Sequence, residues 1–213
     1  MLLIVWGHIR LGDWSNAFAY AFHIPLFFTL SGMMFNRSRY PDFKTLLRKK
    51  VKSLLVPYFI FSFITWVVWA VFSYVTHANV DSYLMPLAQT VIAQGSGGYL
   101  VHNVPLWFVT CLFMIEVIYY FLANLSDGKI LLTTMLMATA SYVLINYCTA
   151  FDFSEMPWNI EVALLGIPFY AVGHLAVKKW SNEGLINIVN HHKKGSWIIV
   201  FLLATLVLIG SIY

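Results

Sequence analysis

Long apolar runs are the feature that most constrains how this chain can fold. An α-helix needs about 20 apolar residues to cross the hydrocarbon core of a bilayer. Five or six runs approach or reach that length: Ala17–Phe35, Leu54–Val75, Leu106–Leu125, Ile130–Ala150, Ile160–Val177 and Trp197–Tyr213. Because backbone polar groups in lipid must be hydrogen-bonded within the protein, such runs favour helices. We therefore predict an all-α, polytopic transmembrane helical bundle with about six spans.

The composition excludes a soluble globular domain. Hydrophobic residues make up 60% of the 213 residues and charged residues 10%, against about 45–50% and 25% in soluble domains. A surface of ordinary size could not be kept hydrated by so few charges. The sequence has no internal repeat, low-complexity tract or composition break, so a single domain over residues 1–213 is predicted.

Both ends of the chain suggest that it is incomplete. Met1 opens directly into an apolar stub that ends near His8, without the basic leader or cleavage site of a signal peptide. The stub is too short to span a bilayer, so it is interpreted as an N-terminal partial helix. The last apolar run stops at Tyr213 without a polar tail.

Basic residues indicate the orientation of the helices. When the spans alternate in direction, only Arg10 falls on the side opposite the other lysines and arginines. The positive-inside rule makes the basic side the cytoplasm. The net charge of +4 therefore reports topology, and no nucleic-acid partner is expected. The basic residues lie at Arg37, Arg39, Lys44, Arg48, Lys49, Lys50, Lys52, Lys129, Lys178, Lys179, Lys193 and Lys194.

Two histidines lie in the predicted outer half of the membrane. His8 ends the stub, and His23 follows about 9 Å along the next helix at 1.5 Å per residue. A short connection makes an antiparallel hairpin, in which the two imidazoles could face each other. Histidine titrates near neutral pH and can remove a proton from a hydroxyl group. The alternative is that each histidine only bridges packed helices through a hydrogen bond.

Other polar residues at membrane depth also need an explanation. Glu116 lies in the middle of a span, where a lone carboxylate is costly, so it should face the bundle interior. It could orient a histidine, bond to Tyr120 one turn away, or act only as a structural contact. A helix start explains Glu161, and a cytoplasmic helix end explains His174. No metal-ligand spacing surrounds the two cysteines, so no metal site is expected.

The basic run Lys44–Lys52 has two interpretations. It could be a cytoplasmic anchor drawn to anionic lipid, which charge alone favours. It could also bind the phosphates of a cytosolic nucleotide-like donor, since guanidinium and ammonium groups bind phosphate well.

Several strings, taken together and in order, resemble segments of the membrane acyltransferase 3 family. They cover most of the chain, and the nearest branch is that of fucose 4-O-acetylase-like acetyltransferases. The strings are WGH at residues 6–8, FHIPLFFTLSG at 22–32, the basic segment and LVPY within 43–58, PLWFV at 105–109, PWNIE at 157–161 and FYAVG at 169–173. Members of this family usually have around ten spans and a basic residue upstream of the first-helix histidine, which this chain starts too late to contain.

The resemblance implies an enzyme that moves an acyl group, usually acetyl from acetyl-CoA, to a carbohydrate hydroxyl. By the matching motifs, His8 would be the essential catalytic histidine, which deprotonates the acceptor hydroxyl or relays the acyl group. His23 would be the second catalytic residue and would line the same site as the substrate-binding Ser31. Arg48, Lys50 and Lys52 would meet the phosphates of CoA. Trp107 and Glu116 would form part of the substrate-binding wall.

We therefore predict an integral membrane O-acetyltransferase, multi-pass in a bacterial inner membrane. Its acceptor would be a cell-surface glycan or a lipid-linked precursor, and membrane lipid would surround it. The rival interpretation is a non-catalytic membrane bundle, either transporter-like or an inactive fragment. The enzyme requires His8 and His23 to converge, whereas the rival predicts separated histidines and basic residues that point to lipid headgroups.

Overall fold

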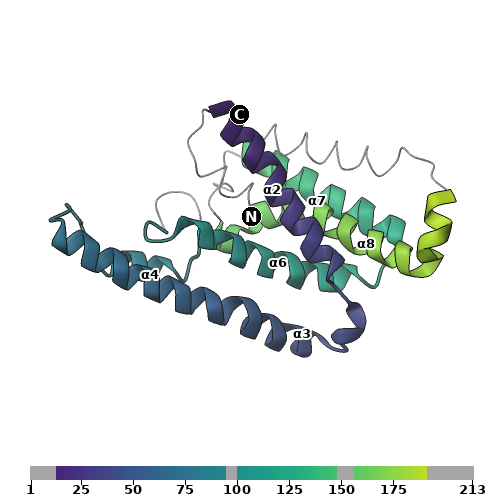
Figure 1. The fold of residues 1–213 in the computed structure, drawn as a ribbon, viewed down its shortest axis with the longest axis horizontal. Helices are drawn as coiled ribbons and strands as arrows, with labels where there is room; N and C mark the ends of the chain where they lie inside the picture. The colour runs from purple at the N-terminus through teal and green to yellow at the C-terminus, as the bar shows by residue number, and fades with distance from the viewer. Residues whose placement is uncertain (1–12, 95–99, 148–155, 191–213) are drawn as a thin grey trace. The chain divides into compact units, whose positions relative to one another are not determined.

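The computed structural model describes residues 13–94, 100–147 and 156–190, and every regular element within them is helical. Figure 1 shows their arrangement along the chain. The elements are α2 (Asp13–Met33), η1 (Arg37–Arg39), α3 (Phe43–Lys50), η2 (Val51–Leu55), α4 (Val56–Val75), α5 (Met85–Gln89), η3 (Val104–Leu106), α6 (Trp107–Leu122), α7 (Asp127–Tyr147), η5 (Pro157–Asn159) and α8 (Ile160–Asn190). The predicted all-α fold is confirmed.

Four helices in the described part of the chain are long and apolar enough to cross a membrane. They cover Phe43–Val75, Val104–Leu122, Asp127–Tyr147 and Pro157–Trp180. Each contains most of one predicted span, so the prediction of a helical membrane protein holds. Helix α2 occupies the place of the first predicted span. The predicted last span, Trp197–Tyr213, and the N-terminal partial helix lie outside the described residues.

The basic segment lies between the predicted spans Ala17–Phe35 and Leu54–Val75, and in the structure it is helical. Asp42 caps the new helix: its Oδ1 accepts a hydrogen bond of 2.8 Å from the backbone N–H of Thr45. The Thr45 hydroxyl donates to Oδ2 at 2.9 Å. Capping satisfies an N–H group that the first helical turn leaves without a partner. Helices α3 and α4 therefore run on as one long helix, as Figure 1 shows.

The chain divides into two compact units. Unit 1 comprises Met1–Asn36, Ala123–Tyr142 and Leu165–Tyr213, and unit 2 comprises Arg37–Leu122 and Val143–Leu164. Helices α2, most of α7 and most of α8 belong to unit 1. Helices α3, α4, α5 and α6 belong to unit 2.

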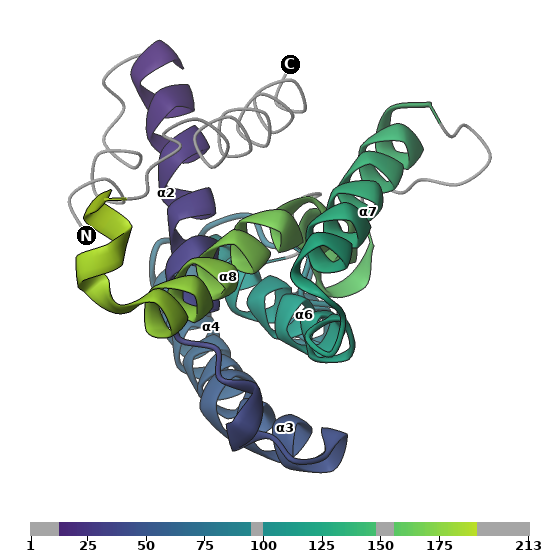
Figure 2. The same ribbon diagram turned by 90° about the vertical axis from the view of Figure 1, so that its right-hand side faces the viewer.

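Unit 1 is built around a close crossing of α2 and α8, which Figure 2 shows from a second direction. A Cβ atom placed on Gly32 would lie 2.0 Å from the backbone oxygen of Tyr170. One placed on Gly173 would lie 1.9 Å from the backbone oxygen of Thr29. Both distances are far inside van der Waals contact, so only glycine fits at either position. Small residues allow helix backbones to approach closely in membranes.

In unit 2, hydrogen bonds to backbone oxygens join two segments at the predicted outer ends of the helices. The Trp158 N–H donates to the oxygen of Ile92 at 2.9 Å, and the Asn159 side chain donates to Ala93 at 2.7 Å. The Trp158 ring packs edge-on against Phe113, with centroids 5.6 Å apart. Trp158 and Asn159 both have positive φ angles, of 61° and 52°. These contacts hold the start of α8 against α6 and the segment after α5.

Candidate active site

The long helix of unit 2 is distorted on the side predicted to be cytoplasmic. Val51–Leu55 forms a π-turn, in which the Val56 N–H bonds back to the oxygen of Val51. Pro57 explains the wider turn, because it has no N–H to donate and its ring crowds the carbonyl one turn earlier. A π-turn lets the helix continue past the proline while changing which way the preceding residues face. Lys50 is the last residue before this turn.

Lys50 faces α6 and forms an ion pair with Glu116. Its Nζ lies 2.6 Å from Oε1 of the carboxylate, between residues 66 positions apart in the sequence. Only 18% of the Lys50 side chain and 6% of the Glu116 side chain are exposed. A buried charge must be paired to be tolerated, and each of these two groups supplies the other's partner. The sequence analysis considered a histidine and Tyr120 as partners of Glu116, and it did not predict this contact with Lys50.

Two tyrosine rings contact basic groups in this part of unit 2. The Arg37 guanidinium lies 4.1 Å from the centroid of the Tyr120 ring. The ammonium groups of Lys49 and Lys50 lie 5.5 and 5.7 Å from the centroid of Tyr40. All three distances fall within the reach of cation–π attraction, about 6 Å. Tyr40 and Tyr120 are both buried, so packing restricts the movement of the two rings that contact these basic groups.

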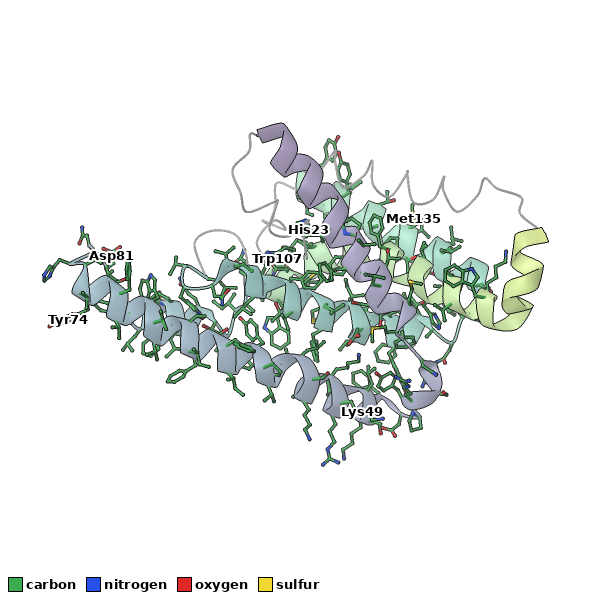
Figure 3. The ribbon with its side chains drawn as sticks, viewed as in Figure 1. His23, Lys49, Tyr74, Asp81, Trp107 and Met135 are labelled. Atoms are coloured by element: carbon green, nitrogen blue, oxygen red, sulfur yellow. The ribbon has the colours of Figure 1, made fainter. Side chains whose placement is uncertain are left out.

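Other basic residues of the same helix are exposed. Lys44 and Arg48 are one turn apart on α3, and Lys52 follows in the π-turn. We call Lys44, Arg48 and Lys52 the cationic face. Figure 3 shows Lys49 at this end of the long helix, with Tyr74 and Asp81 at the opposite end. The cationic face and Lys50 therefore lie on the same helical segment, on the side predicted to be cytoplasmic, but Lys50 is turned toward α6 while the cationic face is exposed.

The helix ends meet as the predicted topology requires. In unit 2, Phe43 at the start of α3 packs against Phe121 near the end of α6, with ring centroids 5.1 Å apart. In unit 1, Lys178 of α8 pairs with Asp127 at the start of α7. Each contact joins two segments that the distribution of lysine and arginine places in the cytoplasm.

The residues predicted on the acceptor side are His8, His23, Ser31 and Trp107. His8 lies outside the described residues, so its predicted approach to His23 stays a prediction. His23 and Ser31 are both half-buried on α2, and the eight positions between them correspond to about 12 Å along the helix. Ser31 adjoins Gly32, so the close crossing with α8 fixes its backbone. Trp107 is the first residue of α6 and is half-buried beside Phe108.

Sequence reasoning did not single out His102, in the segment before α6. Both of its ring nitrogens are buried and make no hydrogen bond. Burial lowers the pKa of His102 below its usual value, so the imidazole is neutral near pH 7. Its position next to the PLWFV string was visible in the sequence, but burial of the ring nitrogens was not. Within the described residues, no three His, Cys, Asp or Glu side chains gather as a metal site would require.

Comparison with protein families gives a match over the whole chain. The sequence model of the acyltransferase 3 family, described as an acyltransferase domain, matches residues 1–213. The match covers the segment that carries the ion pair and the cationic face, and also the two helices that cross at Gly32 and Gly173. No match was found among curated proteins or among solved structures.

Proposed function

Because this chain belongs to the acyltransferase 3 family, we propose that it transfers an acetyl group from acetyl-CoA to a hydroxyl of a cell-surface glycan or its lipid-linked precursor. Membership of the family and the four apolar helices make it a membrane acyltransferase. The proposed location is a bacterial inner membrane. The acetyl group, the CoA donor and the carbohydrate acceptor are the proposed details.

The observation that carries the donor assignment is the cationic face. CoA bears several phosphate groups, and guanidinium and ammonium groups bind phosphate through charge-assisted hydrogen bonds. Arg48 is exposed on α3 and Lys52 in the π-turn that follows it, whereas Lys50 between them is turned toward α6 and its ion pair. The positive-inside rule places this segment in the cytoplasm, where acetyl-CoA is made. We propose that Arg48, Lys50 and Lys52 bind the donor's phosphates.

On the acceptor side, His8 is proposed as the catalytic base, with His23 and Ser31 lining the same site. Because the donor's phosphates would bind on the cytoplasmic side and His8 is predicted in the outer half, the thioester end of the donor would have to reach His8 through the helix bundle. There the acceptor hydroxyl oxygen attacks the thioester carbonyl while its proton passes to the imidazole of His8. The C–S bond then breaks, and the departing CoA sulfur takes up the proton that His8 holds. The products are the acetyl ester and free CoA, so the imidazole returns to its starting state. Trp107 is proposed to contact the sugar with its aromatic face.

The test is acetyl transfer in membranes that contain this chain. Labelled acetyl-CoA is supplied with a panel of carbohydrate acceptors, and the labelled ester is measured. Transfer is expected from the unmodified chain and should be lost in His8→Ala. His77→Ala serves as the matched control, because His77 is exposed in the loop after α4. Absence of transfer from properly inserted protein with every acceptor would favour the non-catalytic interpretation.

A further inference from the structure

The ion pair with Lys50 points to a role for Glu116 that differs from its predicted place in the substrate-binding wall. We infer that Glu116 is a positioning residue of the donor site, which holds the Lys50 ammonium where it can meet a phosphate of the acyl-CoA donor. This inference rests on the proposed function. Glu116 would act through Lys50 and would touch neither substrate.

The depth of the pair supports this role. Glu116 lies six residues before the end of α6 at Leu122, which corresponds to about 9 Å along the helix. Lys50 lies six residues before Val56, where α4 begins, or about 9 Å by the same rise. Glu116 therefore lies in the half of α6 that is nearer its predicted cytoplasmic end. A cytosolic phosphate could reach this level, whereas a glycan on the outer side would have to cross most of the bilayer.

The ammonium group of Lys50 has donors to spare. A protonated lysine has three N–H donors and no acceptor. One donor is directed at Oε1 of Glu116, and the ring of Tyr40 lies on another side at 5.7 Å. The side chain is 18% exposed, so part of it remains accessible from outside the protein. Lys50 can keep its carboxylate partner and bond to a phosphate oxygen at the same time.

Without Glu116, the Lys50 ammonium would not stay at this position. Removing an ammonium from water costs several kcal/mol, and long basic side chains avoid that cost by turning back toward the headgroups. Glu116 opposes this movement with a charged contact of 2.6 Å. The carboxylate weakens the attraction between Lys50 and a phosphate, but it fixes the ammonium in place. The cationic face supplies the remaining positive charge.

The test separates donor binding from acceptor binding. Glu116→Gln keeps the side-chain size and is expected to raise the KM for acetyl-CoA about tenfold, the effect of one charge-assisted hydrogen bond. The KM for the acceptor should change less than twofold. Lys129→Met is the control, because it removes an exposed basic residue at the start of α7 on the same predicted side. A rise in the acceptor KM alone would overturn the inference and place Glu116 at the acceptor.

A charge swap distinguishes positioning from a purely structural pair. Lys50→Glu combined with Glu116→Lys keeps an ion pair but moves the ammonium to α6. The swapped protein should recover the thermal stability that Glu116→Gln loses, yet its KM for acetyl-CoA should stay raised. Recovery of both properties would overturn the inference. Lys50→Arg, which keeps a positive charge on α3, should retain part of the donor affinity.

A binding measurement keeps this inference separate from the proposed function. Free coenzyme A is titrated into the purified full chain in lipid nanodiscs, and its Kd is measured by calorimetry. The Kd should rise about tenfold in Glu116→Gln and no further when Lys50→Met is added, since the carboxylate acts through the lysine. If no acetyl transfer is seen but this pattern holds, the donor site stands and the proposed reaction fails. Equal Kd values for all variants would overturn the inference.

Discussion

Unit 1 and unit 2 each contain a crossing of two helices, and the two crossings are made by opposite means. At Gly32 and Gly173, α2 and α8 touch through their backbones, with no room for a single extra carbon. At Lys50 and Glu116, α3 and α6 are joined by the tips of two long charged side chains. One contact depends on the absence of side chains and the other on their charge.

The difference shows two solutions to one physical problem. Lipid tails are as apolar as leucine, so the hydrophobic effect does little to bring helices together inside a bilayer. Close van der Waals packing and polar pairing remain as the sources of attraction. A backbone contact gives rigidity but cannot bind a ligand. An ion pair gives less rigidity, but it leaves a charged group that can bind a ligand. We therefore expect size to be critical in unit 1 and charge in unit 2.

The largest effect is expected from Gly173→Ile. The new side chain meets the backbone of Thr29, and neither helix can yield without losing the crossing. We expect a loss of about 3 kcal/mol in the free energy of unfolding, the upper end for overpacking. Reversible unfolding in mixed micelles measures it. Gly128→Ala is the control, because a Cβ at that position meets nothing within 4 Å. Similar stability of the two variants would mean that the crossing is not close.

A smaller effect is expected from Lys50→Met, which leaves Glu116 buried without this partner. Breaking a buried ion pair costs about 3–5 kcal/mol, and the partial exposure of Lys50 should reduce the loss to about 2 kcal/mol. The same unfolding measurement applies. The double variant Lys50→Met with Glu116→Leu should recover most of the loss, because no buried charge remains. If the double variant were less stable than the single one, charge would not be what matters at this crossing.

Asp42→Ala should have a local effect on the charged crossing. Without its cap, the first turn of α3 opens more often, and hydrogen exchange at the Thr45 amide should speed up several-fold. The amides of α6 should be unaffected. Asp42→Asn is the control, because asparagine caps as well as aspartate. Unchanged exchange in Asp42→Ala would show that the ion pair, and not the cap, holds this turn.

The smallest expected effect is a pH dependence of stability that arises from His102. It would report on the predicted outer end of unit 2 and not on the ion pair. Burial lowers the pKa of His102 below its usual 6.5, so the unfolded chain binds the proton more readily. Stability should be complete above about pH 6.5 and should fall as pH drops toward the lowered pKa. The Tm difference between about pH 7.5 and 5.5 should be smaller in His102→Gln than in the unmodified protein. An equal difference in both would show that His102 does not contribute.

The sequence allowed the membrane fold to be predicted, because each apolar run is a local signal. The predicted span Leu106–Leu125 differs from the observed Val104–Leu122 by only a few residues at either end. Helix α3 was not among the predicted helices, because its lysines and arginines fall between two apolar runs. Basic residues are good helix formers, however, and Asp42 three residues before Thr45 was a visible cap signal.

The candidate site could be predicted only in part. A motif resemblance drew attention to Lys50 and Glu116, but it placed them in two different roles. Their pairing depends on which faces of α3 and α6 meet, and residues 66 positions apart carry no local signal of that. The π-turn caused by Pro57 changes the facing of Lys50 and is equally hidden from simple helical periodicity. The convergence of His8 and His23 stays a prediction.

The length of the α3–α4 helix has a consequence for the lipid around it. Its 20-residue α4 segment is about 30 Å long and matches an average hydrocarbon core, whereas the whole 33-residue helix is about 50 Å long. A thicker bilayer would draw the Lys50–Glu116 pair into hydrocarbon, and a thinner one would expose it to water. Hydrophobic mismatch of a few ångströms costs fractions of a kcal/mol per ångström. The state of the pair is thereby tied to bilayer thickness, and the protein should be sensitive to the acyl-chain length of its lipids.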